Sequence, residues 1–306
     1  MKKVFLVTND FVNIRLDKWF KRNVCEVPQS LIEKNIRKGK IRVNDKKKSG
    51  AYRLQEKDEI FINNINFSTD KNTKNKNKNK YIATAKDISR SSSIFVENNE
   101  NFAVINKPAS IAVQSGTRSK RNILDILRMT KEFENFTPYP VHRIDKETTG
   151  LLIVAKNRKY AQLFTSLFRL RKIHKTYLGI VVGEFSNSSG ILSDYLFHYE
   201  GNKKIKTKGI THFRVIDSNT NYSFLKLEPK TGRKHQLRKQ LLMHGHPIYG
   251  DSKYRLAESY KNKKNKLMLH AYKINFLINE KKYNFSTEPP SYFKEILKEK
   301  YLKSFL

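Results

Sequence analysis

An alternating run of lysine and asparagine divides the chain more sharply than any other feature of its sequence. The run lies between Asn63 and Lys80 and reads NNINFSTDKNTKNKNKNK. Such a stretch cannot bury a hydrophobic core, and its lysines repel one another, so we expect a solvated linker. It could add phosphate contacts, but an inert spacer is the simpler interpretation. We therefore expect a small domain at residues 1–63, a flexible Asn/Lys-rich linker at 64–90 and a larger domain at 91–306.

Positive charge is the second constraint on what this chain can do. Lys and Arg number 62 and Asp and Glu number 28, which gives a net charge of +34 in 306 residues. A codon bias toward A and T would enrich lysine and asparagine, but it should enrich glutamate as well. A polyanionic partner explains the imbalance better, because each phosphate that is neutralised releases counterions. Nucleic acid is therefore favoured over a merely basic surface or an anionic membrane.

The sequence predicts a reducing compartment and no membrane attachment. Cys25 is the only cysteine, so no internal disulfide can form. Only the four apolar residues from Val4 to Val7 follow the first lysines, which is too few for a signal peptide. No stretch approaches the ~18 apolar residues of a membrane span. We expect a soluble cytoplasmic protein with no membrane partner.

Before the linker, the pattern predicts two helices and short strands. Apolar residues recur at helical spacing in the first helix, at Leu16, Trp19, Phe20 and Val24. A second helix is predicted to begin at Ser30, which stands in the capping-box relation to Glu33, and to end at Gly39. Strands are predicted at residues 41–43 and 60–62.

The same segment resembles the RNA-binding module named for ribosomal protein S4. The resemblance lies in the string RLDKWFKRNVCEVPQSLIEKNIRKGKIRVNDKK and in the YRLQEKDEI that follows it. It implies a small α+β unit that holds structured RNA through its helix pair. The RNA contacts that it implies are basic residues of this segment, namely Arg15, Lys18, Arg37, Lys38 and Arg42.

Beyond the linker, predicted strands and helices are interspersed without regular alternation. Strands are expected at residues 94–96, 102–105, 151–155, 177–182, 211–216, 223–227 and 267–276. Helices are expected at residues 123–129, 159–168 and 234–244. This order favours an α+β domain around a mixed, mostly antiparallel central sheet.

Motifs for cofactors and metals are missing from the sequence. It contains no Walker-type loop, no dinucleotide-binding glycine triplet and no Cys-x-x-Cys. The closest histidine pair, His244 and His246, has no carboxylate or thiol at a useful spacing for a metal. We therefore expect neither a cofactor nor a metal.

Two polar clusters contain groups that could do chemistry. In PVHRIDKETTG, residues 140–150, Asp145 lies between Arg143 and Lys146, and such cations favour an ionised carboxylate that could act as a nucleophile or base. On this string alone, a structural ion pair or a turn-forming aspartate is the simpler interpretation. In EPKTGRKHQLR, residues 228–238, a Thr-Gly turn could present backbone amides to phosphate, or could simply begin a basic helix.

The motifs taken together resemble those of a known family. NKPASIAVQ, HRIDKETTG, KTYLGIVVG and LEPKTGRKHQLR with its sequel HGHPIYGD follow one another in the order found in pseudouridine synthases of the RluA family. With the S4-like module, the chain is most similar to the RluC type, over residues 13–300 without the linker. The resemblance implies isomerisation of specific uridines in 23S (large-subunit) ribosomal RNA to pseudouridine, with no cofactor or metal.

The resemblance also assigns roles to individual residues. Asp145 takes the place of the catalytic aspartate, and Arg238 that of the arginine that pairs with it. Arg143 matches the arginine that enters the RNA as the target base flips out. Tyr177, which alone could be an ordinary strand aromatic, matches the tyrosine that packs on the flipped uracil and is proposed to help remove its C5 proton. Further RNA contacts are expected from two basic residues near this arginine, Arg233 and Lys234.

One carboxylate is sufficient for this reaction in principle. Glycosidases use two because a leaving oxygen must be protonated and a water activated. Uracil instead spreads negative charge over its own carbonyls, and no water should enter. Whether Asp145 acts as a nucleophile or as a base at the ribose stays open at this point. Flipping the base out of its stack would cost a few kcal/mol.

Two other functions fit parts of the sequence. A tRNA substrate is the alternative within the enzyme class, although many relatives that act on tRNA lack the N-terminal module. A non-catalytic RNA-binding or ribosome-assembly protein would explain the charge and the first domain alone. The joint presence of Asp145, Tyr177 and Arg238 argues against the latter. No protein partner is implied, and we expect a monomer.

Overall fold

The computed structural model describes most of the chain, and it divides the chain into two compact units. The described residues are 2–8, 11–24, 27, 29–63, 92–115, 121–200, 203–256 and 266–303. The two units are residues 1–78 and 79–306, and the division falls within the Lys/Asn run. The expected linker at 64–90 and Cys25 lie outside the described residues. Within these residues, no helix is long and apolar enough to cross a membrane.

The first unit packs two helices against a three-stranded antiparallel sheet. Its strands lie in the order β1-β3-β2, with β1 at Lys2–Leu6, β2 at Ile41–Val43 and β3 at Glu59–Asn63. The helices are α1, Leu16–Asn23, and α2, Gln29–Arg37. Both predicted helices and both predicted strands are present, and β1 is an addition. One core of apolar side chains joins these elements, among them Leu16, Trp19, Phe20, Ile32, Ile41 and Ile60.

Helix α2 ends as predicted but begins one residue too early for the predicted cap. Gln29 is already helical, so Ser30 lies inside the first turn and the expected capping box is wrong. At the other end, Gly39 has a φ of +71° and its amide donates to the Ile36 carbonyl at 2.9 Å. Glycine adopts this left-handed conformation without steric penalty, which is why the helix stops there.

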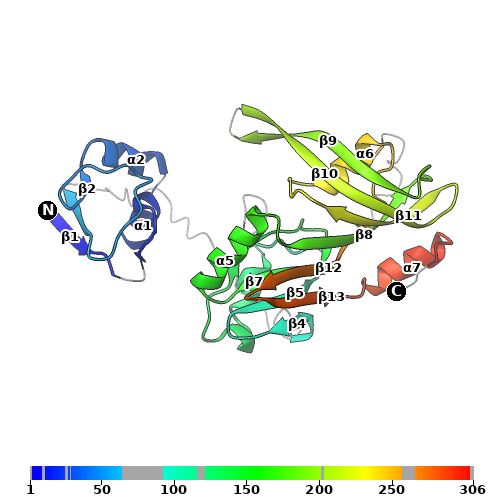
Figure 1. Ribbon diagram of the computed structural model, residues 1–306, viewed down its shortest axis with the longest axis horizontal. Coiled ribbons are helices and arrows are strands. Elements are labelled where there is room, and N and C mark those ends of the chain that lie inside the picture. Colours follow the sequence, from blue (N-terminus) through cyan, green and yellow to red (C-terminus); the bar gives the residue numbers. More distant parts are fainter. Residues whose placement is uncertain are drawn as a thin grey trace. The chain divides into compact units, whose positions relative to one another are not determined.

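The second unit is built around one ten-stranded sheet in the described part of the chain (Figure 1). The strand order is β4-β5-β7-β12-β8-β11-β10-β9, with β13 beside β12 and β6 beside β7. The strands are β4 Phe95–Asn98, β5 Phe102–Lys107, β6 Tyr139–Pro140, β7 Thr149–Ala155, β8 His174–Val182, β9 Ser189–Glu200, β10 Lys203–Ser218, β11 Tyr222–Pro229, β12 Leu269–Ile278 and β13 Lys281–Ser286.

The sheet is mixed and mostly antiparallel, as predicted. Strands β7 and β12 pair in parallel, with His270 opposite Thr149 and Ala271 opposite Gly150. The other neighbouring strands pair antiparallel in the described residues. All seven residues of β7 are buried, which explains why it reads as a continuous apolar run rather than an alternating one.

Short helices pack beside this sheet. They are α4 Ile123–Leu127, α5 Arg158–Arg169, α6 Gln236–Met243 and α7 Ser291–Glu299, with 3₁₀ turns at Ser92–Ile94 and Lys131–Phe133. Asn122 and Asn157 cap α4 and α5 by accepting hydrogen bonds from backbone amides three residues later. The three predicted helices are present, but α6 begins two residues after the expected Lys234. Helix α7 is an addition.

Some strands differ from the prediction. The 3₁₀ turn ends at Ile94, so β4 begins at Phe95 instead. Strand β10 begins at Lys203, eight residues before the predicted start, and pairs with β9, which was not predicted. Strand β9 was missed because its sequence, SGILSDYLFHYE, carries apolar side chains on both faces. Strand β13 was not predicted either.

Candidate active site

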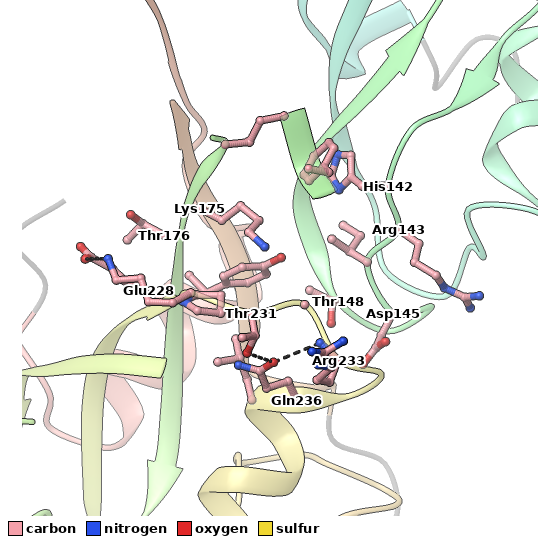
Figure 2. A pocket seen from close by; sticks show the side chains of 18 of the residues that line it. His142, Arg143, Asp145, Thr148, Lys175, Thr176, Glu228, Thr231, Arg233 and Gln236 are labelled. Carbon is pink, nitrogen blue, oxygen red and sulfur yellow. Dashed lines mark hydrogen bonds and ion pairs between the residues drawn. The ribbon is translucent and has the colours of Figure 1, made fainter. Parts of the chain in front are cut away.

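A cleft of about 1080 Å³ opens in the second unit between segments that are far apart in the sequence. One wall comes from the loop between β6 and β7, with His142, Arg143 and Asp145. The others come from the end of α5 and the start of β8, and from the end of β11 with the turn that leads into α6. All four of Asp145, Arg143, Glu228 and Thr176 line the cleft, and Figure 2 shows the first two at one side of the view and the last two at the other.

Arg238 joins Asp145 to a second, deeper carboxylate. Its Nη1 lies 3.1 Å from Asp145 Oδ2, while its Nε and Nη2 donate to the two oxygens of Asp251 at 2.7 Å each. The side chain of Asp145 is 20% exposed, whereas that of Asp251 is 0% exposed. Burial lowers the pKa of Arg238, but the hydrogen bonds and charges of the two carboxylates outweigh it and raise that pKa above its usual value. The guanidinium is therefore a fixed cation that holds one side of the Asp145 carboxylate.

A histidine that the sequence analysis did not single out lies on the other side of Asp145. His235 Nε2 is 3.6 Å from Asp145 Oδ1, and its Nδ1 is 2.8 Å from the hydroxyl of Tyr254. Burial is the main cause that lowers the pKa of His235, to about 4, and the nearby Arg238 adds to it against the opposing effect of Asp145. At neutral pH the ring is uncharged, so Arg238 is the cation that contacts Asp145.

Tyr177 lies in the floor of the cleft, on β8. Burial raises the pKa of its hydroxyl above the usual range, and the charge of Asp145 adds to that effect. The hydroxyl is therefore protonated at neutral pH, and it could pass a proton on only by accepting one in exchange. Its ring packs against two of the hydrophobic cores of this unit at once, which fixes its orientation.

Lys175, two residues before Tyr177, adds a cation to the same wall. Figure 2 shows its side chain extending from β8 toward the side of the cleft that carries His142. Burial lowers the pKa of Lys175. Together with burial, the charge of Lys175 lowers the pKa of His142 to about 3. His142 is thereby neutral, and its Nε2 accepts a hydrogen bond from the Ile153 amide at 2.8 Å.

A buried lysine holds the Asp145 loop in place through hydrogen bonds. Lys107, at the end of β5, is 0% exposed, and its Nζ donates to the carbonyls of Pro108 at 2.7 Å, Ile111 at 3.0 Å and Lys146 at 3.1 Å. Burial lowers the pKa of Lys107 to about 7, against the opposing charges of Glu147 and Asp145. These three bonds connect the loop after β5 to the residue next to Asp145.

Two buried oxygens at the cleft have no hydrogen-bond partner within the described structure. They are the hydroxyl of Thr148 and the side-chain carbonyl of Asn275, and both residues line the cleft. A buried polar atom without a partner is costly, and native proteins usually satisfy such atoms.

The cleft brings together all of the predicted site residues of the second unit. Asp145, Tyr177 and Arg238 line it, with the exposed Arg143 on the same loop as Asp145. The two further basic residues, Arg233 and Lys234, are exposed on the turn before α6. Arg143 and Lys146, the sequence neighbours of Asp145, are not the cations that contact it, because Arg238 occupies that position from α6.

The Thr-Gly turn is arranged differently from the expectation. The Thr231 hydroxyl and the Arg233 amide both donate to Oε1 of Gln236, at 2.7 and 3.0 Å (Figure 2). His235 takes the position before α6 in a left-handed conformation, with a φ of +54°. The amide of Arg233 is thus already occupied by Gln236. The basic helix also contains only Arg238 and Lys239 as cations, and Arg238 is buried.

In the first unit, the predicted RNA-contact residues divide into two groups. Lys18, Arg37 and Lys38 are exposed. Arg15 binds the carboxylate of Asp17 at 2.7 Å, and Arg42 donates to the Gly39 carbonyl at 3.0 Å. Arg15 and Arg42 therefore also form contacts that stabilise the first unit.

Asp251, Tyr254, His235 and Lys107 are the site residues that sequence reasoning missed. Asp251, His235 and Lys107 stand in strings noted as family motifs, HGHPIYGD, TGRKHQLR and NKPASIAVQ, whereas Tyr254 stands in none of them. Nothing local in these strings shows that Asp251 pairs with Arg238. No group of three or more His, Cys, Asp or Glu among the described residues could hold a metal.

Comparison with known proteins decides the family. The model of the family described as RNA pseudouridylate synthase matches residues 101–243. "Ribosomal large subunit pseudouridine synthase C" of Buchnera aphidicola subsp. Baizongia pistaciae is 33% identical, over 95% of this chain and 95% of its own length. The protein of the same name from Rickettsia bellii is 32% identical, over 96% of this chain and 100% of its own. The chain belongs to the RNA pseudouridylate synthase family.

Solved structures agree with this family. The human protein titled "RNA Pseudouridylate Synthase Domain Containing 4" superposes with a TM-score of 0.62 at 25% identity, over 71% of this chain and 96% of that one. The chain is thus an RNA pseudouridine synthase of the RluA/RluC type, an isomerase, with a mixed and mostly antiparallel sheet. Most of the residues that line the cleft fall within the matched residues 101–243, and Asp145, Tyr177 and Arg238 are among them.

Proposed function

We propose that this pseudouridine synthase isomerises specific uridines of large-subunit ribosomal RNA, with Asp145 as its catalytic carboxylate. The observation that carries the proposal is the contact between Asp145 and Arg238 in a cleft of about 1080 Å³. The names of the curated relatives, at about one-third identity over nearly the whole chain, support the ribosomal substrate. A monomer is our expectation for the active species.

The reaction needs no co-reactant, since its atoms balance within the nucleotide. The bond from C1′ to N1 breaks, a bond from C1′ to C5 forms, and the proton lost from C5 is replaced by one gained at N1. Asp145 supplies the carboxylate, as a nucleophile at C1′ or as a base at the ribose. Arg238 orients the carboxylate through Oδ2, and the other oxygen, Oδ1, lies beside the uncharged His235.

Tyr177 and Arg143 would handle the base. The ring of Tyr177 offers a flat apolar surface for a flipped uracil, and its protonated hydroxyl can exchange protons beside it. Arg143 is exposed on the Asp145 loop, so it can enter the RNA stack at the position that the base leaves. This insertion would offset part of the few kcal/mol that unstacking costs.

The first unit would serve as an S4-like RNA-binding domain. Its exposed cations on and beside the helix pair, Lys18, Arg37 and Lys38, can contact phosphates without reading sequence. Deletion of residues 1–63 should therefore weaken RNA binding more than it slows the chemical step. Equal affinities and equal single-turnover rates for the full-length and truncated proteins would contradict this role.

The test of catalysis is Asp145→Asn, which preserves shape and removes the charge. We expect no pseudouridine in ribosomal RNA treated with this variant, and full activity from Glu134→Gln, a matched change at an exposed acid outside the cleft. Pseudouridine formation by Asp145→Asn at the wild-type rate would refute the mechanism. A wild-type protein that binds ribosomal RNA but modifies no uridine would support the assembly-protein alternative instead.

The substrate is tested separately, by mapping. Pseudouridines in ribosomal and transfer RNA are compared between a strain that lacks the gene and the same strain complemented with it. We expect sites in large-subunit ribosomal RNA to disappear and return. Sites that change only in transfer RNA would replace the proposed substrate with the tRNA alternative.

A further inference from the structure

Strands β9 and β10 continue past the rest of the sheet as a two-stranded ribbon (Figure 1). Strand β11 pairs with β10 only from Thr211 onward, whereas β9 pairs with β10 back to Lys203. The described residues of β10 before Thr211 therefore pair with β9 but not with β11. We call residues 191–197 and 204–210 the ribbon.

The two faces of the ribbon differ in composition. Side chains alternate along a strand, and cross-strand partners share a face. One face is buried beside α6, with Leu192 and Leu196 at 3% exposure each. The opposite face carries Ile191, Tyr195 and Phe197, which are 61%, 54% and 45% exposed. Large apolar side chains are thus presented to solvent in one row.

Lysines are interleaved with these aromatics on the exposed face. Lys204 Nζ lies 4.4 Å from the ring centroid of Phe197, and Lys206 Nζ lies 4.3 Å from that of Tyr195. Lys208 is directly opposite Tyr195 in the register. No Asp or Glu shares this face among the described residues of the ribbon.

The β10 edge of the ribbon borders the cleft, although the exposed face of the ribbon is the opposite side of the sheet from the one that carries Tyr177 and α6. The Ile210 carbonyl accepts from the Lys230 amide at 2.9 Å, and the Lys208 carbonyl accepts from Arg233 Nε at 3.3 Å. Lys230 and Arg233 both line the cleft. An RNA bound in the cleft reaches the exposed face by passing around this edge, and residues 204–210 extend for roughly 20 Å at the usual rise per strand residue.

We propose that the exposed face of the ribbon binds unpaired nucleotides of the substrate RNA that flank the target uridine. Tyr195 and Phe197 stack on bases, and the interleaved lysines contact phosphates. Aromatic rings separated by cations are the arrangement that single-stranded nucleic acids bind without sequence preference. A protein partner fits less well, since lysine is depleted where protein interfaces are buried. The inference rests on the proposed function, because it takes the substrate of the cleft as its ligand.

The first experiment uses the double variant Tyr195→Ala/Phe197→Ala in the full chain. Its affinity for a ribosomal RNA fragment with unpaired nucleotides beside the target is measured by fluorescence anisotropy at fixed salt. We expect a loss of affinity of about ten-fold for each base that no longer stacks. The single-turnover rate at saturating enzyme should stay within two-fold of the wild type, because neither residue lines the cleft.

Three variants and one RNA fragment serve as controls that separate stacking from folding and from exposure. Tyr195→Phe keeps the ring and should retain wild-type affinity. Leu277→Ala and Tyr301→Ala remove apolar side chains that are 56% and 90% exposed elsewhere, and they too should leave affinity unchanged. A fragment with the flanking nucleotides fully base-paired should bind the wild type and the double variant equally.

Salt dependence tests the lysines. Replacing Lys204, Lys206 and Lys208 with glutamine should lower the slope of log affinity against log salt by about 2, at roughly 0.7 per phosphate contact to a single strand. Unchanged affinity of the double alanine variant, or an equal loss with the base-paired fragment, would overturn the proposal. If the wild type formed no pseudouridine but the variant still lost affinity, the proposed function would fail and the ribbon would stand.

Discussion

Asp251 holds Arg238 by two hydrogen bonds of 2.7 Å, and this leaves the remaining guanidinium nitrogen, Nη1, to contact Asp145. Asp251 does not line the cleft. It also accepts hydrogen bonds from the amides of Lys253 and Tyr254, at 2.8 and 2.9 Å, so it is fixed by its own loop. The orientation of the Asp145 carboxylate therefore depends on a residue that does not line the cleft.

Asp251→Asn should reduce both stability and activity. Removing one partner of a buried ion pair costs about 3–5 kcal/mol, and Arg238 would keep its contact with the partly exposed Asp145 as the remaining charge compensation. We expect a loss of this order in the free energy of unfolding measured with urea, and a slower single-turnover rate. Glu288→Gln, which breaks an exposed 2.8 Å pair with Lys294, should change stability by about 0–1 kcal/mol. Equal unfolding midpoints for the two variants would show that the Arg238–Asp251 pair contributes little.

Tyr177→Phe should separate the hydroxyl from the ring. The phenylalanine ring keeps the apolar surface and the packing of both cores, so RNA affinity should hold. The chemical step should slow by at least about 10²-fold if the hydroxyl exchanges a proton there. Rapid-quench measurement of pseudouridine formation at saturating enzyme gives this rate. A variant as fast as the wild type would limit Tyr177 to stacking.

Gly150→Ala should disturb the loop that carries Asp145. Gly150 has a φ of +105°, and a methyl group there would lie 2.7 Å from the backbone nitrogen of Ala271 and closer still to its carbonyl oxygen. Backbone on both sides prevents relief by a side-chain rotation, so β7 and β12 would have to separate. We expect lower thermal stability and lower activity. Gly245→Ala, where φ is +82° but no atom lies within 4 Å, measures the backbone strain alone.

Stability should fall as the pH drops from about 6.5 to about 4. Burial lowers the pKa of His142 to about 3, and those of His235 and His270 to about 4, against an ordinary value of 6.5. In this window the unfolded chain binds protons that the folded chain excludes, so protonation favours unfolding. Stability from these groups is complete above pH 6.5.

His270→Gln tests the contribution of one of these histidines. His270 is 0% exposed, and its ring nitrogens lie 2.9 Å from the Thr149 hydroxyl and the Thr287 carbonyl. From the shift in its pKa, we expect His270 to account for about 3 kcal/mol of the free energy of unfolding that is lost between pH 6.5 and pH 4. The variant should flatten the curve of unfolding free energy against pH by that amount, and His174→Gln, at an exposed histidine, should not. If the variant left this curve unchanged, the lowered pKa of the buried His270 would be contradicted.

Elements with one strong local pattern could be predicted from the sequence, and contacts between distant segments could not. Strand β7 is a single apolar run, and helix α2 ends at a glycine, so both were predicted. Strand β9 was missed because its solvent face carries Tyr195 and Phe197, which obscure the alternation on which strand prediction depends. The same exposed residues carry the inference about RNA.

The site shows the same division. The roles proposed for Asp145, Tyr177 and Arg238 came from a resemblance between motifs, and the structure brings these residues to one cleft. The pairing of Arg238 with Asp251 was not predicted, because the two residues are thirteen positions apart and either could have paired elsewhere. Which distant side chains pair is decided by the packing of the whole domain, and a local sequence pattern contains no information about that packing.

The parallel seam between β7 and β12 has a mechanical consequence. The register joins these strands only at His270–Thr149 and Ala271–Gly150, while β5–β7 and β12–β8 on either side pair over longer ladders. Asp145 lies just before β7, and Arg238 is on α6 beside the β9–β10 side of the sheet. Twisting the sheet about this short seam would change the distance between them. We therefore expect the distance between Asp145 and Arg238 to depend on the stiffness of these two residue pairs.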